Sequence, residues 1–310
     1  MKKTGILAII LSCVLLLCSC GIKPADDRTV LVLSGKNINH DYYRYVYMNT
    51  AADYENPGEH GDEIAASALK TLIHNRAIEL VAEKYGVKLS SDDKKAVNSW
   101  YKEQKASVSD EEWQKNLSLN YLTEYLLVSI QEFNTLWQKI YDYYTDEMNM
   151  VIRIDDKGLK DMIPEVFHNV MYVMISSDSE NAYEKASQVK ALADSGADFK
   201  KLVLEYGEDE NMKSLIDSGY YYVDGEIVPS VEDEVKKLNV GDVSDVIETD
   251  LGYFVIKVLD IDGEYVDKHL NTFRTDYFAY MFNKEVTETE KKVTVEKKPL
   301  YDEFNAGKAE

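Results

Sequence analysis

The period of the apolar residues changes near Pro164, and this change most restricts how the chain of 310 residues can fold. Before that point, apolar side chains recur every three or four residues, which is typical of one buried face on a helix. After it, short β-branched and aromatic runs alternate with helical segments. The sequence therefore predicts an α+β protein, in which a mainly helical body is followed by a mixed module.

The helical part has recognisable starts and stops. Val30–Leu33 reads as a short strand before a turn, and an aromatic-rich helix is expected from Asn39. Glu63–Tyr85 carries a clearer helical pattern that ends at Gly86, and Ser90–Asp93 is a cap signal for the next helix. The longest pattern predicts one continuous apolar stripe packed in a core, made of Leu122, Leu126, Ile130, Phe133, Trp137, Ile140 and Tyr144.

The mixed module begins with a strand at Val170–Ile175. A capping box at Ser177–Glu180 is expected to open a helix that stops at Gly196, and a second short helix follows. Another strand, a helix and a strong strand at Tyr253–Leu259 complete the order βααβαβ over about 100 residues. After Gly263 the chain returns to helix.

The N-terminal residues have the pattern of a targeting signal. Two lysines, an apolar run from Ile6 to Leu17 and small residues form a secretory signal, too short for a comfortable membrane span. Leu17–Cys20 resembles the lipobox of bacterial lipoproteins, in which the final cysteine carries diacylglycerol; an uncleaved anchor helix is the alternative. The expected mature protein begins at Cys20 and is held at the outer face of the cytoplasmic membrane by its acyl chains.

Charge and cysteine positions exclude several functions. All three cysteines lie in the first 20 residues, so the mature chain has no disulfide, catalytic thiolate or Cys-zinc site. Loss of Lys2 and Lys3 takes the formal charge of −21 to −23, which argues against nucleic acid as a partner. The five histidines show no paired-ligand spacing, so no metal is expected, and no motif indicates a cofactor.

Three stretches of the mixed module resemble the parvulin (rotamase) domain family. Tyr172–Ile175 is similar to its first strand, and Gly196–Phe199 with Glu205–Asp209 to its Gly-Ala-Asp-Phe helix and the loop after it. Most specific is the succession from Gly225-Glu226-Ile227-Val228-Pro229 through Leu238–Ser244 to Thr249–Val258.

The flanks resemble the extracytoplasmic foldases of the PrsA/SurA type. The opening Val32–Ile38 and the segments Thr71–Arg76 and Lys84–Ser90 carry this resemblance. It implies a helical chaperone domain with an inserted parvulin-like domain. The expected division is signal peptide 1–19, lipidated tether 20–28, first part of the chaperone domain 29–163, parvulin-like domain 164–262, and a C-terminal helical segment 263–310 that rejoins the chaperone domain.

The parvulin resemblance implies six site positions. Asp209 and Thr249 match the family, whereas its two histidines fall on Tyr172 and Phe254, and its proline-pocket Met and Phe fall on Ile227 and Val231. Tyr172 can still donate a hydrogen bond, but Phe254 cannot. Two interpretations follow: a working site on Tyr172, Asp209 and Thr249, or a domain that keeps the fold without efficient turnover. His168 would lie on the same side as Tyr172 if the strand extends that far.

These features predict a membrane-anchored foldase or holdase that binds unfolded, exported polypeptides through apolar and aromatic surface. An active peptidyl-prolyl cis-trans isomerase is the first alternative. The second is a lipoprotein that binds a small solute or acts as a scaffold. The sequence does not define the clients, the oligomeric state or the docking of the C-terminal helix.

Overall fold

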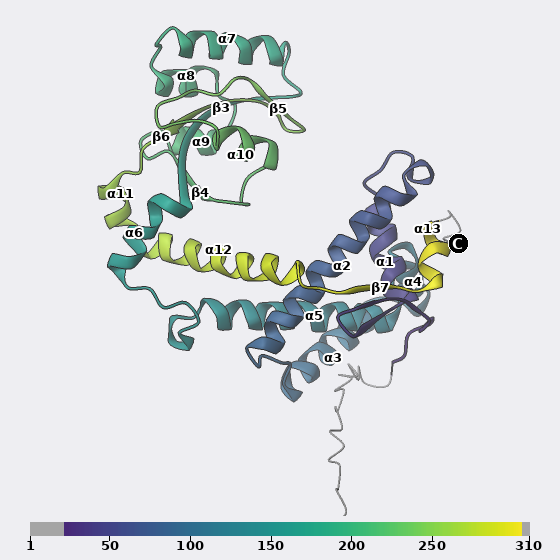
Figure 1. Cartoon of the computed structure of the whole chain (residues 1–310). Coiled ribbons are helices and arrows are strands. Elements are labelled where there is room, and N and C mark those ends of the chain that lie inside the picture. The colour runs from purple at the N-terminus through teal and green to yellow at the C-terminus, as the bar shows by residue number, and fades with distance from the viewer. Residues whose placement is uncertain (1–21, 306–310) are drawn as a thin grey trace, which may run out of the picture. The chain divides into compact units, whose positions relative to one another are not determined.

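A computed structural model of the chain describes residues 22–305 (Figure 1). Its contacts divide the described residues into two compact units, one of 22–144 with 283–305 and the other of Thr145–Phe282. Helices predominate and the sheets are small, so the α+β class is confirmed. The domain boundaries expected from the sequence stay a prediction.

The first unit combines a small sheet with several helices. The sheet has the order β2-β1-β7, and both of its pairings are antiparallel. The helices include a long α2 and a long α5 (Figure 1). The elements of this unit are β1 (Thr29–Leu33), β2 (Lys36–Asn39), α1 (His40–Ala51), α2 (Gly61–Lys84), α3 (Ser91–Ala106), α4 (Asp110–Leu119), α5 (Glu124–Thr145), β7 (Val295–Lys297) and α13 (Pro299–Asn305).

Several sequence predictions in this unit are confirmed. Helix α2 ends before Gly86, whose φ of +70° favours glycine. Ser90 and Asp93 form a reciprocal capping box at the start of α3. The predicted stripe is only partly buried, however. Leu126, Ile140 and Tyr144 lie in the interior, whereas Ile130 and Phe133 are half-buried beside a cavity and the Trp137 side chain is exposed, so the expectation of one continuous core was wrong.

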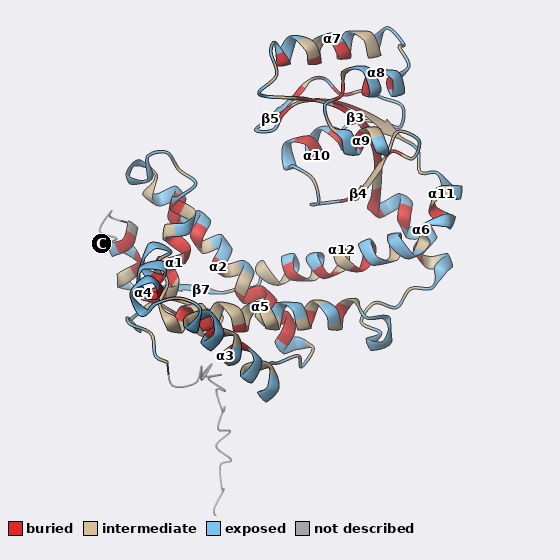
Figure 2. Ribbon diagram, turned by 180° about the vertical axis from the view of Figure 1, so that it is seen from behind, coloured by how far each residue is buried: buried red, intermediate tan, exposed pale blue. Residues whose placement is uncertain are grey.

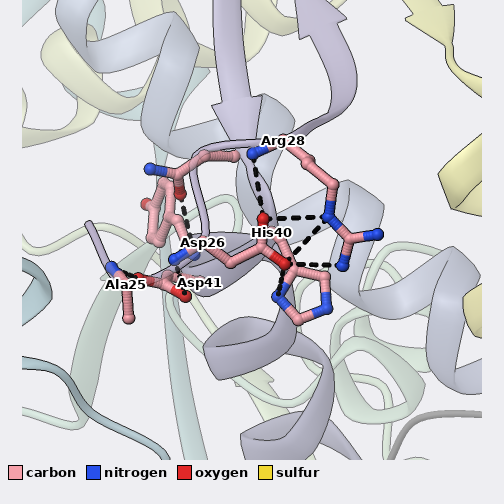
Figure 3. A network of polar contacts seen from close by, with 7 residues as sticks. Ala25, Asp26, Arg28, His40 and Asp41 are labelled. Carbon is pink, nitrogen blue, oxygen red and sulfur yellow. Dashed lines mark hydrogen bonds and ion pairs between the residues drawn. The ribbon is translucent and has the colours of Figure 1, made fainter.

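A polar network joins residues 25–28 to the start of α1 in the first unit (Figure 3). The Asp41 carboxylate, at the start of α1, accepts hydrogen bonds from the backbone amides of Ala25 at 2.7 Å and Asp26 at 3.2 Å. The Asp26 carboxylate accepts a 2.6 Å bond from Arg28, which lowers the pKa of Asp26 to about 2. His40 Nδ1 lies 3.4 Å from the same carboxylate. Residues 25–28 are therefore bound to the body of the unit.

The second unit is built on a four-stranded antiparallel sheet of order β4-β3-β6-β5. Helices α7 and α8 cover one face and α10 covers the other, with buried side chains along β3 between them (Figures 1 and 2). The elements are α6 (Asp156–Val166), β3 (Phe167–Ser176), α7 (Ala182–Asp194), α8 (Phe199–Tyr206), α9 (Glu210–Ser214), β4 (Tyr220–Val223), α10 (Pro229–Val235), β5 (Ile247–Thr249), β6 (Gly252–Leu259) and α11 (Gly263–Lys268).

Two details of this unit differ from the sequence prediction. Helix α7 begins at Ala182 after Asn181 in the left-handed conformation, without a side-chain cap. The capping box predicted at Ser177–Glu180 was therefore wrong: the Ser177 amide donates to the Leu251 carbonyl at 3.2 Å, and the Ser179 hydroxyl donates to the Glu208 carboxylate at 2.7 Å. Short elements α9 and β5 were also missed.

Helix α12 (Leu270–Glu290) runs from the second unit into the first. Its first half packs on α6 and β3 through Phe273, Tyr277 and Phe278. Its last residues bind α2 of the first unit, with Lys84 Nζ 2.6 Å from Glu285 and His74 Nδ1 2.5 Å from Glu290. After it, β7 pairs with β1, so the two ends of the described chain share one sheet.

Candidate functional site

Strand β3 places Tyr172 beside Phe254 of β6. Because side chains alternate across a strand, Tyr172 faces α10, whereas its neighbours Met171 and Val173 face α7 and α8. Met174 is registered opposite Phe254, and the Tyr172 and Phe254 rings lie 5.6 Å apart at 56°. The structure therefore brings together the two residues on which the sequence resemblance places the histidines of the family.

Tyr172 and Asp209 form the shortest hydrogen bond among the predicted site residues. The Tyr172 hydroxyl donates to Asp209 Oδ2 at 2.6 Å, and Asp209 Oδ1 caps α9 by accepting from the Asn211 amide at 2.8 Å. Burial, and secondly the bond to Asp209, raise the pKa of Tyr172. The phenol is thus protonated at neutral pH, and its one proton is already donated within the protein.

Ile227 and Val231 join the same apolar cluster. Val231 is buried in the first turn of α10, which begins at Pro229, and Ile227 packs partly buried against the same group of side chains. Tyr172 and Phe254 also border this cluster. The two predicted proline-pocket positions therefore lie on the face of the sheet that carries Tyr172.

Thr249 is engaged in the hairpin between β5 and β6. Its hydroxyl donates to the Gly252 carbonyl at 2.9 Å and accepts from the Leu251 amide at 3.2 Å. Gly252 has a φ of +140°, and a Cβ there would meet the Ile175 carbonyl oxygen at 2.1 Å, so the hairpin requires glycine. Within residues 22–305, no hydrogen bond joins Thr249 to Tyr172 or Asp209.

His168 lies at the start of β3, which extends far enough to place it on the same face as Tyr172. Its Nε2 is 2.8 Å from Asp224 Oδ1, and its ring stacks on Tyr222 at 5.1 Å. The imidazole is therefore bound to Asp224 and Tyr222.

Two tyrosines of β4 were not singled out from the sequence. Tyr220 and Tyr222 stack at 6.1 Å; the Tyr220 hydroxyl donates to Glu226 at 3.1 Å, and the Tyr222 hydroxyl is buried without a hydrogen-bond partner among the described residues. Burial is the main reason that the pKa of Tyr222 is raised. The run Tyr220-Tyr221-Tyr222 was the available signal, since alternate residues of a strand share a face.

The chemistry available at this site is limited. Rotation about an X-Pro bond faces a barrier of roughly 20 kcal/mol and needs no covalent step, so a catalyst must bind the twisted amide more tightly than the planar one. Phe254, Ile227 and Val231 supply apolar surface. The Tyr172 phenol can present its oxygen lone pairs, but it cannot donate to a substrate carbonyl without breaking its bond to Asp209.

Two further observations concern ions and membranes. Across residues 22–305, no three His, Cys, Asp or Glu side chains gather closely enough to hold a metal ion. No helix in this part of the chain is both long and apolar enough to cross a membrane. The predicted signal peptide and the predicted lipid-bearing Cys20 lie outside the described residues.

Comparisons with known proteins identify the second unit most clearly. Residues 160–262 match the family model of the PPIC-type PPIASE domain. The foldase protein PrsA of Geobacillus kaustophilus is 35% identical over 109 residues, which cover 35% of this chain and 38% of that protein. Foldase protein PrsA 3 of Bacillus anthracis is 27% identical over 164 residues, covering 50% and 56%. The chain thus spans from about two fifths to just over half of the length of these relatives.

Among solved structures, the peptidyl-prolyl isomerase PrsA of Bacillus anthracis is 22% identical with a TM-score of 0.34, covering 72% of this chain and 96% of that one. The parvulin of Nitrosopumilus maritimus is 28% identical with a TM-score of 0.26, covering 31% and 97%. The resemblance found in the sequence is confirmed: residues 160–262 match the model of the PPIC-type PPIASE domain, and the chain is similar to the PrsA foldases.

Proposed function

We propose that this protein is a foldase that binds unfolded polypeptides outside the cytoplasm and has little prolyl-isomerase turnover. Similarity to the PrsA foldases supports the chaperone role, and the PPIC-type match of residues 160–262 supports descent from an isomerase. Clients would be exported chains in the act of folding. Exposed apolar side chains on such chains are the chemical feature that a holdase recognises.

One observation carries the low-turnover part of the proposal. The Tyr172 hydroxyl donates to Asp209 at 2.6 Å, and Phe254, which has no polar atom on its side chain, lies beside it. Stabilisation of a twisted amide depends on polar groups that are free to act on it. Here the donor is used internally and the second histidine position is apolar.

An active isomerase is the second candidate, and a specific contact favours it. Tyr172, Asp209 and the apolar pair Ile227 and Val231 remain on adjoining elements of the PPIC-type domain. If substrate binding displaced the Asp209 bond, the phenol would become a donor. In this case turnover would depend on the hydroxyl of Tyr172.

Isomerisation of short X-Pro peptides, measured without protease coupling, and suppression of aggregation of an unfolded protein test the two candidates together. We expect suppression of aggregation, and turnover close to the uncatalysed rate in both the wild type and Asp209→Ala. Glu210→Gln, which changes the neighbouring acid at the exposed start of α9, is the matched control. Turnover that is abolished by Asp209→Ala but not by Glu210→Gln would contradict the low-turnover proposal.

We also propose that Cys20 carries the lipid that holds the protein at the outer face of the membrane. The lipobox-like Leu17–Cys20 after an apolar run supports this. In an expressing bacterium, metabolic labelling with a fatty acid should mark the wild type and not Cys20→Ala. Equal labelling of the two would contradict lipidation at this residue.

A further inference from the structure

A cavity of about 470 Å³ lies within the first unit, between β2, α1, α2 and α5. This volume is within the range of ordinary ligand pockets. Much of its wall is aromatic or aliphatic, including Tyr42, Tyr45, Tyr125, Ile130 and Phe133. Ile130 and Phe133 belong to the stripe predicted to be core, so this part of α5 faces open space.

One wall residue stands apart from this apolar surface. Glu132 is only 3% exposed, and its Oε2 atom is shielded from solvent without a hydrogen-bond partner among the described residues. Burial is the main cause that raises the pKa of Glu132, and the charge of Lys94 only partly opposes it. An ionised carboxylate in such a place is costly unless a cation or donor joins it.

Helix α5 itself provides the comparison. Eight residues earlier, the Glu124 carboxylate accepts from the Tyr101 hydroxyl at 2.8 Å, Lys105 Nζ at 2.7 Å and Trp113 Nε1 at 2.9 Å. These bonds connect α3, α4 and α5, and the bond from Lys105 is the largest cause that lowers the pKa of Glu124. Glu124 thus holds three helices together, whereas the buried Oε2 of Glu132 has no partner in the part of the chain that the structure describes.

The other charges of the cavity wall are already paired. Lys36 binds Glu79, and Glu79 also accepts from Arg76 at 3.0 Å. The Asn75 amide donates to the Tyr42 hydroxyl at 2.9 Å. With Lys36 and Glu79 offsetting each other, Glu132 leaves the wall with an uncompensated negative charge when it is ionised.

We propose that this cavity receives a basic side chain of an unfolded polypeptide, with the cation on Glu132 and the aliphatic stem against the rings of Tyr45 and Phe133. Lysine and arginine have this build, an apolar stem with a charged end. Charge-assisted bonds to a carboxylate and contacts with aromatic faces both favour such a guest. The inference rests on the proposed chaperone role and specifies its clients: segments in which a basic residue adjoins apolar ones.

Calorimetric titration of the whole chain with a capped Leu-Lys-Leu peptide tests the site. The matched probe replaces lysine with norleucine, which keeps the stem and removes the charge. We expect the lysine peptide to bind the wild type about tenfold more tightly than the norleucine peptide, and Glu132→Gln to remove this preference. Asp142→Asn, an exposed change on the same helix with the same effect on net charge, should keep it.

Equal binding of the two peptides to the wild type would overturn the proposal. So would an equal loss of preference in Glu132→Gln and Asp142→Asn, because the overall charge of −21 would then explain the attraction. Ser129→Phe, which would fill part of the cavity, should weaken the binding of both peptides. Unchanged binding would show that the peptides bind elsewhere and would overturn the proposal. Suppression of aggregation is measured on the same samples. If the protein suppresses aggregation but does not bind the lysine peptide, the cavity proposal is refuted and the proposed chaperone role is not.

Discussion

Two carboxylates, one in each unit, differ in what surrounds them. Asp209 accepts a hydrogen bond from the Tyr172 hydroxyl on one oxygen and from the Asn211 amide on the other, so both oxygens of this carboxylate have partners within the second unit. Glu132 lies in a cavity wall, and its buried Oε2 receives no hydrogen bond from the described residues. The Asp209 carboxylate is therefore satisfied within the second unit, whereas the buried Glu132 Oε2 in the first unit has no partner among the described residues.

The tryptophans allow the two units to be followed separately. All three, Trp100, Trp113 and Trp137, lie in the first unit. Tryptophan fluorescence thus reports the helical unit, and far-ultraviolet circular dichroism reports both.

The largest effect is expected at Gly252. A Cβ there would approach the Ile175 carbonyl oxygen to 2.1 Å, so Gly252→Ala should cost the second unit roughly 2–4 kcal/mol of unfolding free energy. Gly225 also has a positive φ, +85°, but open space around it, and Gly225→Ala should cost only about 1 kcal/mol. Denaturant unfolding followed by dichroism measures both. An equal shift of the fluorescence transition in Gly252→Ala would show that the two units unfold together and would contradict this prediction.

The next effect concerns Glu124. Glu124→Gln removes the charge that accepts from Lys105, Tyr101 and Trp113, and we expect a loss of about 1–2 kcal/mol in the fluorescence transition. Because the folded-state pKa of Glu124 is lowered, its contribution is present above the unfolded pKa and is lost as pH falls through the folded pKa. The cost of the substitution should therefore shrink in acid. A cost that is the same at pH 7 and pH 3 would contradict this account.

A smaller loss of unfolding free energy is expected from a change at Tyr172. Tyr172→Phe removes the bond to Asp209 and should cost the second unit about 1 kcal/mol, seen by dichroism and not by fluorescence. Isomerase turnover should not change, because the lost proton was not available to a substrate. A fall in turnover would show that the hydroxyl acts on the substrate.

The smallest effect has the opposite sign. Glu132→Gln removes an unpaired buried carboxylate and should raise the unfolding free energy by up to about 1 kcal/mol at pH 7. Its folded-state pKa is raised, so the folded chain holds this proton more tightly than the unfolded chain and the penalty grows as pH rises above the unfolded value of 4.5. The gain from the substitution should vanish near pH 4. Destabilisation at pH 7 would mean that Glu132 has a structural partner.

The sequence predicted more of the fold than of the site. The capping box at Ser90 and Asp93 is a local interaction, so it could be recognised without the tertiary structure. Strand β7 could not be, because its three residues are all exposed and it is a strand only through pairing with β1. The false capping box at Ser177–Glu180 has a similar cause, since distant residues bind this segment: Leu251 accepts from the Ser177 amide and Glu208 from the Ser179 hydroxyl.

The same limit applies to functional residues. The parvulin resemblance implied that Tyr172, Phe254, Ile227 and Val231 belong to one site, and the structure places all four at one apolar cluster. The cavity did not, because periodicity shows that Ile130 and Phe133 share a side of α5 but not whether an opposing wall fills the space. The acid at Glu132, one residue before Phe133 of that stripe, was the available signal.

The proposed combination of chaperone activity and low isomerase turnover can be measured in the refolding of a protein limited by one X-Pro bond. In the presence of this chain, we expect a higher yield of refolded protein and an unchanged rate of the slow phase, which takes tens of seconds without a catalyst. An accelerated slow phase that returns to the uncatalysed rate in Asp209→Ala would contradict it.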